Sequence, residues 1–442
     1  MKLKTRKTSD FFGSEYCNWG SYDNLRKIAS LVDGQKNASR KILWYSQQKN
    51  LKNEIKVSQL NSKVAESEEY LHGDMSSVIV NLAQDYPGTN NINLMMPEGG
   101  FGTRIKPEAS APRYIYTYGS PEFFKIFSKD DTEILEHQDF EGHRIEPKFM
   151  LPKLPMLLIN GAEGISSGFA QKILPRNPDE LEKYLRYFLN NPTAPRKPFQ
   201  NKPFYRGYRG TIHQGETKNQ WIIQGTFKRE ANKVIISEIP IGYSLKTYIK
   251  VLDKLEDDKK IIGYKDNSVD DFEFVVQFNR KYLDALSDTQ IISLLKLTKK
   301  VSENYTVMTE KNTVQNFDNI NDIFWRYYDV KMQYLQKRKD YMIGNITQDI
   351  RELISKYIFI KSIVDETLII SKRDTADIIT DLDNIDKIIK VENTYDYLLN
   401  MSIRSLTKER MEKLMGQIKD QKSALDVVKI STLNEMWLTE LN

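Results

Sequence analysis

Two short segments of the sequence, residues 97–104 and 111–118, combine side chains that could bind a phosphate group. The first holds three glycines and one arginine: Gly99, Gly100, Gly102 and Arg104. The second holds one arginine and three alternating tyrosines: Arg113, Tyr114, Tyr116 and Tyr118. Glycines let the backbone approach a ligand closely, arginines can hold a phosphate with two parallel hydrogen bonds, and the tyrosines would line one face of an extended segment. Tyrosines in strands usually serve packing, so the residues by themselves predict phosphate binding and leave catalysis open.

Basic residues are concentrated in one stretch, although the net charge of the chain is only +5. The basic residues of this stretch are Arg196, Lys197, Lys202, Arg206, Arg209, Lys218, Lys228, Arg229 and Lys233, against Glu216 and Glu230. Tyr205, Tyr208 and Trp221 lie among them. Basic and aromatic residues interleaved in this way suit the phosphate backbone of a nucleic acid. A solvated strand surface would have a similar composition, so both interpretations stay open.

Length and composition exclude several classes of protein. A chain of 442 residues is too long for one hydrophobic core, so two or three domains are expected. No run of about eighteen apolar residues is present, and no apolar stretch follows the basic N-terminus, so we expect neither a membrane span nor a secretory signal. Cys17 is the only cysteine and the four histidines are scattered, which argues against a disulfide, a thiolate zinc site and a histidine metal site. A reducing compartment is expected.

The elements that must position these residues follow from hydrophobic spacing and capping residues. Residues 37–50 and 74–86 are predicted to be helices, and apolar residues recur every three or four positions in the second. Short helices followed by a glycine-rich, β-branched segment predict a winged-helix module. Ser120 and Asn177 each precede a proline and an acid, which is the signature of a helix N-terminus.

The later part of the chain changes pattern twice. Apolar and polar residues alternate from residue 205 to residue 278, which predicts antiparallel strands. None of the 15 prolines lies after Pro240, so the rest of the chain can build long helices. A heptad seam from Ile346 to Val364 favours a protruding coiled coil over a helix packed on its own domain. We predict an α+β multidomain fold with a winged-helix domain, a strand-rich domain and a long helical region: residues 1–150, 151–318 and 319–442.

Several blocks of the sequence, taken in order, resemble those of the type IIA DNA topoisomerases. Residues 31–41 (LVDGQKNASRK) resemble the family motif DGLKP-x-x-RK, and residues 70–74 (YLHGD) resemble YHHGE. The Gly-Phe-Gly-Thr-Arg loop and the Arg-Tyr-Ile-Tyr-Thr block follow. Two positions depart from the family pattern, since Asn37 replaces a proline and Leu71 replaces a histidine. The resemblance covers nearly the whole chain and is strongest to the medium subunit of the phage-type enzymes, which is gyrase A-like and corresponds to the C-terminal half of eukaryotic topoisomerase II.

The resemblance implies that this chain is the cleavage and rejoining subunit of an ATP-dependent type II topoisomerase. Tyr114 would attack a DNA phosphorus and hold the broken strand as a phosphotyrosine, so that a second duplex can pass through the break. Arg113, Arg40 and His72 would assist by the electrostatic stabilisation that dominates phosphoryl transfer. The other expected DNA contacts are Lys36, Lys41, Arg104, Lys172, Arg206 and Arg209. The alternatives are a plain surface position for Arg40 and a buried, hydrogen-bonded one for His72.

Ile165 lies between glycines in a block, residues 160–168, that also resembles the family. The resemblance implies that Ile165 is a wedge that enters between base pairs of the minor groove and bends the duplex. Bending would carry the DNA arms onto the basic stretch of the strand-rich domain, which corresponds to the family's tower. From the residue type alone, an isoleucine packed in its own core is the favoured interpretation.

The resemblance also implies what this chain must obtain elsewhere. The family's Mg²⁺ is held by acidic residues of a separate fold, and ATP by a separate ATPase region. The only Asp-x-Asp here, at Asp381 and Asp383, reads as a solvated helix face, so we expect no metal site in this chain. Mg²⁺ and ATP would be bound mainly by a partner subunit. The chain would pair with a second copy through a helical gate after the coiled coil, and would act on double-stranded DNA in the cytoplasm, or in the host cytoplasm if it is phage-encoded.

Two other functions fit parts of the sequence. A non-catalytic architectural protein could use a winged helix to bind and bend DNA, but the Arg113–Tyr114 pair and His72 argue against it. A structural coiled-coil dimeriser with an incidental basic surface would leave the glycine-rich loop unexplained. Within the topoisomerase interpretation, relaxation or decatenation is favoured over supercoiling, because no DNA-wrapping domain follows the helical region.

Overall fold

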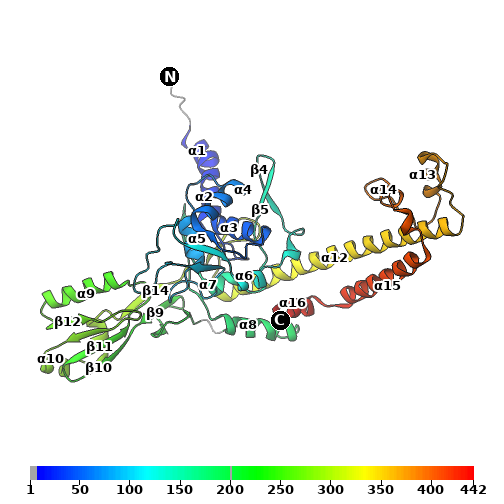
Figure 1. Ribbon diagram of the computed structural model, residues 1–442. Helices are drawn as coiled ribbons and strands as arrows, with labels where there is room; N and C mark the ends of the chain where they lie inside the picture. The colour runs from blue at the N-terminus through cyan, green and yellow to red at the C-terminus, as the bar shows by residue number, and fades with distance from the viewer. Residues whose placement is uncertain (1–6, 200–201) are drawn as a thin grey trace, which may run out of the picture. The chain divides into compact units, whose positions relative to one another are not determined.

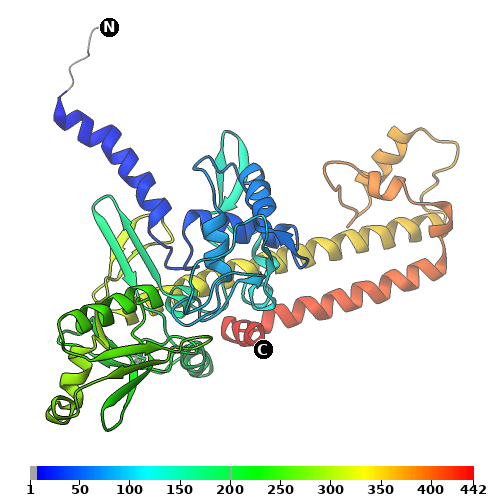
Figure 2. The same ribbon diagram turned by 60° about the vertical axis from the view of Figure 1, so that its left-hand side comes forward.

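The computed structural model describes residues 7–199 and 202–442, which form two compact units, Met1–Lys331 and Met332–Asn442 (Figures 1 and 2). The predicted mixture of helices and small sheets is confirmed. The first unit contains the first two predicted domains and the beginning of the third, so the three-domain division stays a prediction. Across the described residues, no helix has the length and apolar character needed to cross a membrane.

Three short helices and a small antiparallel sheet form the part of the first unit that was predicted to be a winged helix. The helices are α3 (Asn37–Gln48), α4 (Val57–Ser67) and α5 (Ser76–Ala83). The sheet has the order β1 (Ile55–Lys56), β3 (Tyr116–Gly119) and β2 (Met95–Glu98). Helix α5 buries the apolar face that its spacing predicts, whereas α3 is buried at every position from Ser39 to Gln47. The buried apolar side chains of the three helices include Ile42, Leu43, Leu60, Val64 and Ile79.

Helix α3 has a well-defined start, although Asn37 stands where the family pattern has a proline. Helix α3 begins at Asn37, directly after Lys36. Ser39 Oγ accepts a hydrogen bond from Lys36 N at 3.0 Å and donates one to Lys36 O at 3.0 Å. A side chain therefore satisfies the backbone at the N-terminus of the helix, as capping residues do. The two predicted N-caps are also confirmed, since Ser120 begins α6 (Pro121–Ile126) and Asn177 begins α8 (Pro178–Asn190).

A helix that the hydrophobic pattern did not predict precedes the winged-helix part. It runs without interruption through α1 (Thr8–Phe11), the π-turn η1 (Phe12–Tyr16) and α2 (Cys17–Lys27). Aromatic side chains along it are exposed: Phe11, Phe12, Tyr16, Trp19 and Tyr22. The C-terminal end of α2 packs against the hairpin formed by β6 (Ala162–Ser166) and β7 (Phe169–Ile173).

The predicted strand-rich part is present and antiparallel. One sheet has the order β14 (Thr298–Ser302), β9 (Gln220–Gln224) and β8 (Thr211–Gln214). A second sheet has the order β10 (Thr226–Arg229), β11 (Lys233–Glu238), β13 (Phe274–Gln277) and β12 (Gly263–Asp266). One face of the second sheet is covered by α9 (Leu245–Asp257), α10 (Arg280–Ala285) and α11 (Asp288–Leu294). The core between them includes Val234, Ile236, Tyr248, Leu252, Phe274 and Val276.

The remaining elements of the first unit are short. They are β4 (His137–Phe140), β5 (His143–Pro147), α7 (Met156–Asn160), β15 (Thr306–Met308) and β16 (Val314–Asn316). Isolated β-bridges connect chain segments that are far apart in sequence, since Ser30 pairs with Met308 of β15 and Lys172 of β7 pairs with Asn304.

The second unit is helical, as the absence of proline predicts. Its helices are α12 (Ile320–Val364), which begins in the first unit, α13 (Thr375–Asp383), α14 (Asp396–Leu399), α15 (Lys408–Ile430) and α16 (Leu433–Leu441). Helices α12 and α15 lie side by side in Figures 1 and 2. Lys339 Nζ on α12 donates hydrogen bonds to Lys429 O at 2.8 Å and Ser431 O at 2.7 Å. Part of the long helix therefore packs on its own chain.

Candidate active site

Tyr114 is presented at the protein surface by a turn. Its side chain is 66% exposed, and its backbone N–H donates to Ala111 O at 2.9 Å. The guanidinium of Arg113 lies over the Tyr114 ring, with Cζ 4.8 Å from the ring centroid. The hydroxyl can therefore be reached by a large ligand, and a positive charge that is always present accompanies it.

Two of the three alternating tyrosines lie in a strand, and the third lies in the turn before it. Strand β3 begins at Tyr116, whereas Tyr114 lies in the preceding turn, and the intervening Ile115 is buried. Tyr118 donates a hydrogen bond to Glu98 Oε1 at 3.4 Å. Buried Ile115 thus anchors the turn, with exposed Tyr114 and Tyr116 on either side of it in the sequence.

The glycine-rich loop is held inward by Arg104. Its Nη1 donates to Tyr243 O at 2.6 Å, and its Nη2 donates to Ile239 O and Pro240 O, each at 3.2 Å. Gly102 has φ +91°, and a Cβ at this position would collide with Pro107 O. In this structure the guanidinium of Arg104 ties the loop to the segment between β11 and α9, and its contact with a phosphate stays a prediction.

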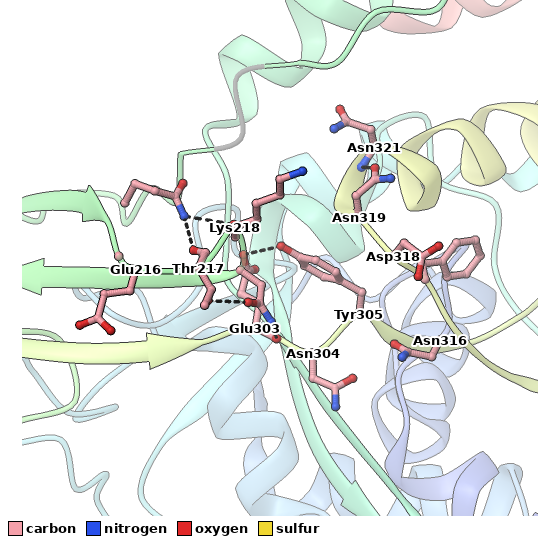
Figure 3. A pocket seen from close by; sticks show the side chains of 14 residues that line it. Glu216, Thr217, Lys218, Glu303, Asn304, Tyr305, Asn316, Asp318, Asn319 and Asn321 are labelled. Carbon is pink, nitrogen blue, oxygen red and sulfur yellow. Dashed lines mark hydrogen bonds between the residues drawn. The ribbon is translucent and has the colours of Figure 1, made fainter.

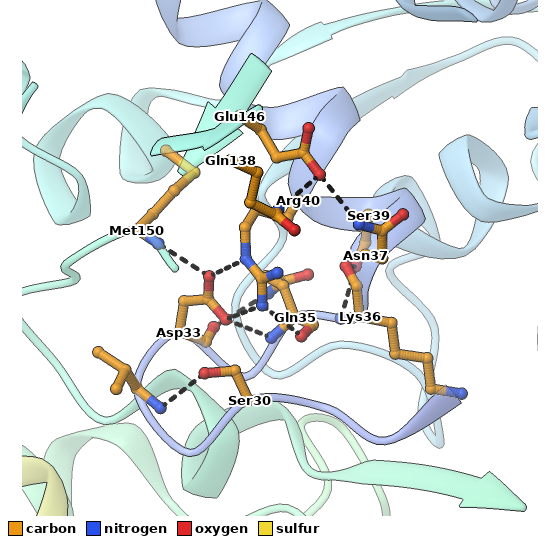
Figure 4. Close-up of polar contacts among 11 residues, drawn as sticks. Ser30, Asp33, Gln35, Lys36, Asn37, Ser39, Arg40, Gln138, Glu146 and Met150 are labelled. Carbon is orange, nitrogen blue, oxygen red and sulfur yellow. Dashed lines mark hydrogen bonds and ion pairs between the residues drawn. The ribbon is translucent and has the colours of Figure 1, made fainter. Parts of the chain in front are cut away.

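Arg40 and Lys41 lie among buried charged groups, and Figure 4 shows the contacts of Arg40. Their exposed fractions are 6% and 4%. Arg40 Nε donates to Asp33 Oδ2 at 2.7 Å and its Nη2 to Gln35 O at 3.0 Å. Lys41 Nζ donates to Glu146 Oε2 at 2.6 Å and also to Glu68 O. Arg40 is therefore not a plain surface arginine. Both side chains are paired inside the protein, and the catalytic role of Arg40 and the DNA contact of Lys41 stay predictions.

His72 lies exposed in the loop between α4 and α5. Its Nε2 contacts the hydroxyl of Tyr22 on α2, and its ring packs edge-on against Tyr70 at 5.7 Å between centroids. Partial burial and the charge of Arg26 lower the pKa of His72. His72 is therefore hydrogen-bonded, as the alternative interpretation had it, but it is not buried.

Ile165 lies on the β6–β7 hairpin and is 76% exposed. It is therefore not part of its own core, which had been the favoured interpretation from residue type alone. Lys36 Nζ donates to Glu163 O at 2.7 Å, and Lys172 Nζ pairs with the Glu163 carboxylate at 3.0 Å. Burial lowers the pKa of Lys36. The structure thus gathers Lys36 and Lys172 at the hairpin that carries Ile165.

The predicted basic stretch is partly paired with acidic and polar groups of the protein itself. Arg209 donates to Asp271 Oδ2 and to Ser237 O, each at 2.9 Å. Arg206 donates to Asn93 Oδ1 at 2.7 Å. Further ion pairs join Arg196 to Asp329, Arg229 to Asp288, and both Lys228 and Lys233 to Glu230. Arg206 and Arg209 are exposed, but the surplus of charge read from the sequence overstates what this surface offers a polyanion.

A polar cavity of about 900 Å³ opens beside buried Glu303 (Figure 3). The Glu303 carboxylate accepts hydrogen bonds from Leu174 N, Arg176, Trp221 Nε1 and the Tyr305 hydroxyl. The amides that line the cavity are already used inside the fold, since Asn319 Oδ1 accepts from Asn321 N and Asn321 Oδ1 accepts from Phe199 N. The polar groups that line this cavity hold the fold together, and the cavity is not the candidate site.

Sequence reasoning missed the residues of α2 that contact the candidate site: Tyr22, Asp23, Asn24 and Arg26. Tyr22 contacts His72, and Asp23 and Asn24 accept hydrogen bonds from the Ile165 hairpin. Helix α2 contains Gly20 and polar residues at mixed spacing, so it has no continuous apolar face to mark it. The role of α2 could have been recognised only from the pairing of Asp23 and Asn24 with the distant Ser-Ser-Gly turn of the hairpin.

Known proteins resemble this chain over almost its full length. It is 32% identical over 447 residues to the mitochondrial DNA topoisomerase 2 of Dictyostelium discoideum, and 30% identical over 499 residues to DNA topoisomerase 2 of Saccharomyces cerevisiae. These alignments cover 98% and 99% of this chain but only 34% of each relative, so the chain spans about a third of their length.

A solved structure and a family model agree with these relatives. The crystal structure of the Plasmodium falciparum topoisomerase II DNA-binding, cleavage and re-ligation domain matches 98% of this chain and 63% of its own, with a TM-score of 0.85 and 30% identity. The family model for the A subunits of DNA gyrase and topoisomerase IV matches residues 26–442. The sequence blocks of this chain resemble those of the type IIA topoisomerases. The chain therefore belongs to the family of DNA gyrase and topoisomerase IV A subunits.

Proposed function

We propose that this chain cleaves and rejoins double-stranded DNA as the tyrosine-bearing part of an ATP-dependent type II topoisomerase. The observation that carries the proposal is the exposed Tyr114 hydroxyl beside Arg113. In the proposed step Tyr114 Oη bonds to a backbone phosphorus, the bond from that phosphorus to the leaving sugar oxygen breaks, and the sugar oxygen takes up a proton. The phosphotyrosine keeps the bond energy, so the reverse attack by the sugar hydroxyl reseals the strand.

The neighbouring residues would then act by charge and by position. A tyrosine hydroxyl ordinarily ionises near pH 10, so the reaction needs a proton acceptor and positive charge near the phosphate. We propose that Arg113 supplies the charge and that His72, whose pKa is lowered, accepts a hydrogen bond or a proton. Arg40 would act as a positioning residue through Asp33. The Asp33 carboxylate also accepts a hydrogen bond from Met150 N at 2.9 Å. Lys36 and Lys172 would contact DNA phosphates next to Ile165.

Metal and nucleotide would come from a partner. Among residues 7–199 and 202–442, no three His, Cys, Asp or Glu side chains are grouped so that they could hold a metal ion. Asp381 and Asp383 of the Asp-x-Asp sequence lie on α13, where they pair with Arg373 and Lys390. We therefore derive no step through the metal, and we assign Mg²⁺ and ATP binding to a partner subunit.

Two copies of the chain would work together, because two tyrosines must cut opposite strands. We propose that the homodimer closes through the second unit, where α15 carries exposed apolar side chains: Met415, Val427 and Ile430. The proposed outcome is relaxation or decatenation of DNA, as the family resemblance of the sequence implies. The cytoplasm stays the proposed compartment, on the basis of the single cysteine and the substrate.

The decisive experiment is capture of the covalent intermediate. The chain is mixed with a candidate ATPase partner chain, Mg²⁺, ATP and a labelled plasmid, and is then denatured with detergent. A labelled band that migrates with the protein and disappears on phosphodiesterase treatment is the expected result. DNA bending without any adduct would instead support the architectural alternative.

A further inference from the structure

Helix α2 carries two sets of contacts on adjacent faces, one for the Ile165 hairpin and one for His72. Tyr22 and Arg26, four residues apart, share one face of the helix. Asp23, Asn24 and Lys27 lie on the neighbouring face. The two candidate functional groups, which are 93 residues apart in the sequence, are therefore held by six consecutive residues.

The hairpin contacts are specific and shielded from water. Asp23 Oδ2 accepts hydrogen bonds from Ser167 N and from Ser167 Oγ, both at 3.0 Å. Asn24 Oδ1 accepts one from Ser166 Oγ at 2.6 Å. The side chains of Asp23 and Asn24 are buried, although the hairpin to which they are hydrogen-bonded carries the exposed Ile165. A carboxylate hydrogen-bonded to a hydroxyl and a backbone amide is a strong and directional anchor.

The backbone approaches just as closely. A Cβ at Gly164 would collide with the carbonyl oxygen of Lys27, the last residue of α2. Lys27 Nζ also pairs with Asp23 at 2.8 Å, and its hydrogen bond is the main reason that the pKa of Asp23 is lowered. Asp23 is therefore ionised at neutral pH, when its anchor to Ser167 is strongest.

The second face of α2 contacts His72. The Tyr22 hydroxyl contacts His72 Nε2, and the Arg26 guanidinium lies 5.7 Å from the centroid of the Tyr22 ring. The same Arg26 contributes to the lowered pKa of His72. A displacement of α2 would therefore change both the hydrogen bond and the charge that His72 experiences.

We infer that α2 couples DNA bending at Ile165 to the orientation of His72, with Asp23, Asn24 and Tyr22 as positioning residues. The inference rests on the proposed function. When a bent duplex displaces the hairpin, Ser166 and Ser167 move with it. Their hydrogen bonds to Asp23 and Asn24 then displace α2, and Tyr22 moves as part of the same helical turn. A cleavage-competent His72 is then favoured on bent DNA, which links strand scission to correct seating of the duplex.

The test follows His72 and DNA bending in the same full-length variants. The imidazole resonance of His72, assigned with His72→Gln, is recorded with and without a 30-base-pair duplex carrying a dye at each end, and adduct formation is timed with the partner subunit present. In the wild type, DNA should bend and should shift the His72 signal. In Asp23→Ala, bending should decrease, the DNA-induced shift of His72 should disappear, and adduct formation should slow by roughly tenfold, the scale of one charge-assisted hydrogen bond.

Further variants separate coupling from simple loss of folding. Ser167→Ala removes only the hydroxyl partner of Asp23 and should give a weaker effect in the same direction, even if Asp23→Ala is poorly folded. Tyr22→Phe should leave bending intact and remove the shift of His72. Asn18→Ala, an exposed residue of the same helix, should behave as the wild type. A His72 signal that responds to DNA unchanged in Asp23→Ala and Ser167→Ala overturns the coupling alone, whereas a wild type that neither bends nor cleaves DNA overturns the proposed function with it.

Discussion

The guanidinium of Arg113 lies 4.8 Å above the ring of Tyr114. A cation over an exposed aromatic ring contributes about 0.5–1 kcal/mol, enough to favour one orientation of a side chain that has few other contacts. The stacking depends on the ring and not on the hydroxyl. The two properties of Tyr114, its orientation and its reactivity, can therefore be separated by mutation.

Tyr114→Phe should abolish the covalent adduct and leave affinity for duplex DNA within about twofold, because binding rests on many phosphate contacts. The phenylalanine keeps the stacking with Arg113 and loses only the nucleophile. Adduct formation and gel-shift titrations measure the two effects. Tyr116→Phe is the matched control and should still form the adduct. The opposite pattern would move the nucleophile by two residues.

Ile165→Ala should reduce bending of a short end-labelled duplex without destabilising the protein. An exposed side chain contributes little to folding, so the melting temperature should change by no more than about one degree. Adduct formation should slow, because less protein surface reaches the unbent duplex. Val269→Ala, at another exposed branched residue, serves as the control. Normal bending with a lower melting temperature would contradict the wedge.

Arg26→Gln should raise the pKa of His72 toward its ordinary value, as measured by NMR titration. Burial is the larger cause of the lowered pKa and remains, while the repulsion by Arg26 is removed. At a pH between the two pKa values, more of the variant's His72 would carry a proton and fewer molecules could accept one from Tyr114. Lys27→Gln should leave the titration unchanged. An unaltered pKa in Arg26→Gln would leave burial as the sole cause.

Glu68→Gln should stabilise the protein at pH 8 and have little effect at pH 5. Burial, with a contribution from Glu146, raises the pKa of Glu68 from 4.5 to about 7. A folded state that holds a proton more tightly than the unfolded state loses stability as pH rises through this window, by at most roughly 3 kcal/mol. The amide removes that loss, so the melting temperature of the variant should depend less on pH. Equal effects at both values would indicate a packing change instead.

Val427→Ser combined with Ile430→Ser should weaken self-association measured by sedimentation equilibrium. Each side chain is exposed on α15, and burying one in an interface stabilises it by about 1.5–3 kcal/mol, so roughly a hundredfold loss in affinity is expected. Lys419→Ala on the same helix should leave the association unchanged. A tight dimer in the double variant would place the closing contact elsewhere.

Local signals in the sequence were sufficient for much of the fold. The caps at Ser120 and Asn177 could be read because each controls only the next turn of its own helix. The strands between residues 205 and 278 showed the alternation of sheets with one buried face. Helix α2 could not be predicted in this way, because its partners are a hairpin and a loop far along the chain and its own spacing marks no apolar face.

The candidate site was only partly predictable for a related reason. Tyr114 and Arg113 are neighbours in sequence, so the pair could be recognised directly. Arg104 has the same side chain as Arg113, but its acceptors at Ile239, Pro240 and Tyr243 lie more than a hundred residues away, and composition cannot tell a paired arginine from an exposed one. The burial of Lys41 could not be foreseen for the same reason, since its partner Glu146 is distant in sequence, whereas Arg40 pairs with Asp33, only seven residues before it.

The hydrogen bonds that converge on Glu303 have a consequence for how the first unit opens. One carboxylate accepts donors from the end of β7, from the start of α8, from β9 and from the approach to β15. None of these segments can separate without leaving a buried charge with fewer partners, which is costly. The amide hydrogen of Leu174 and the indole hydrogen of Trp221 should therefore exchange with solvent at one shared, slow rate, as members of a single cooperative opening.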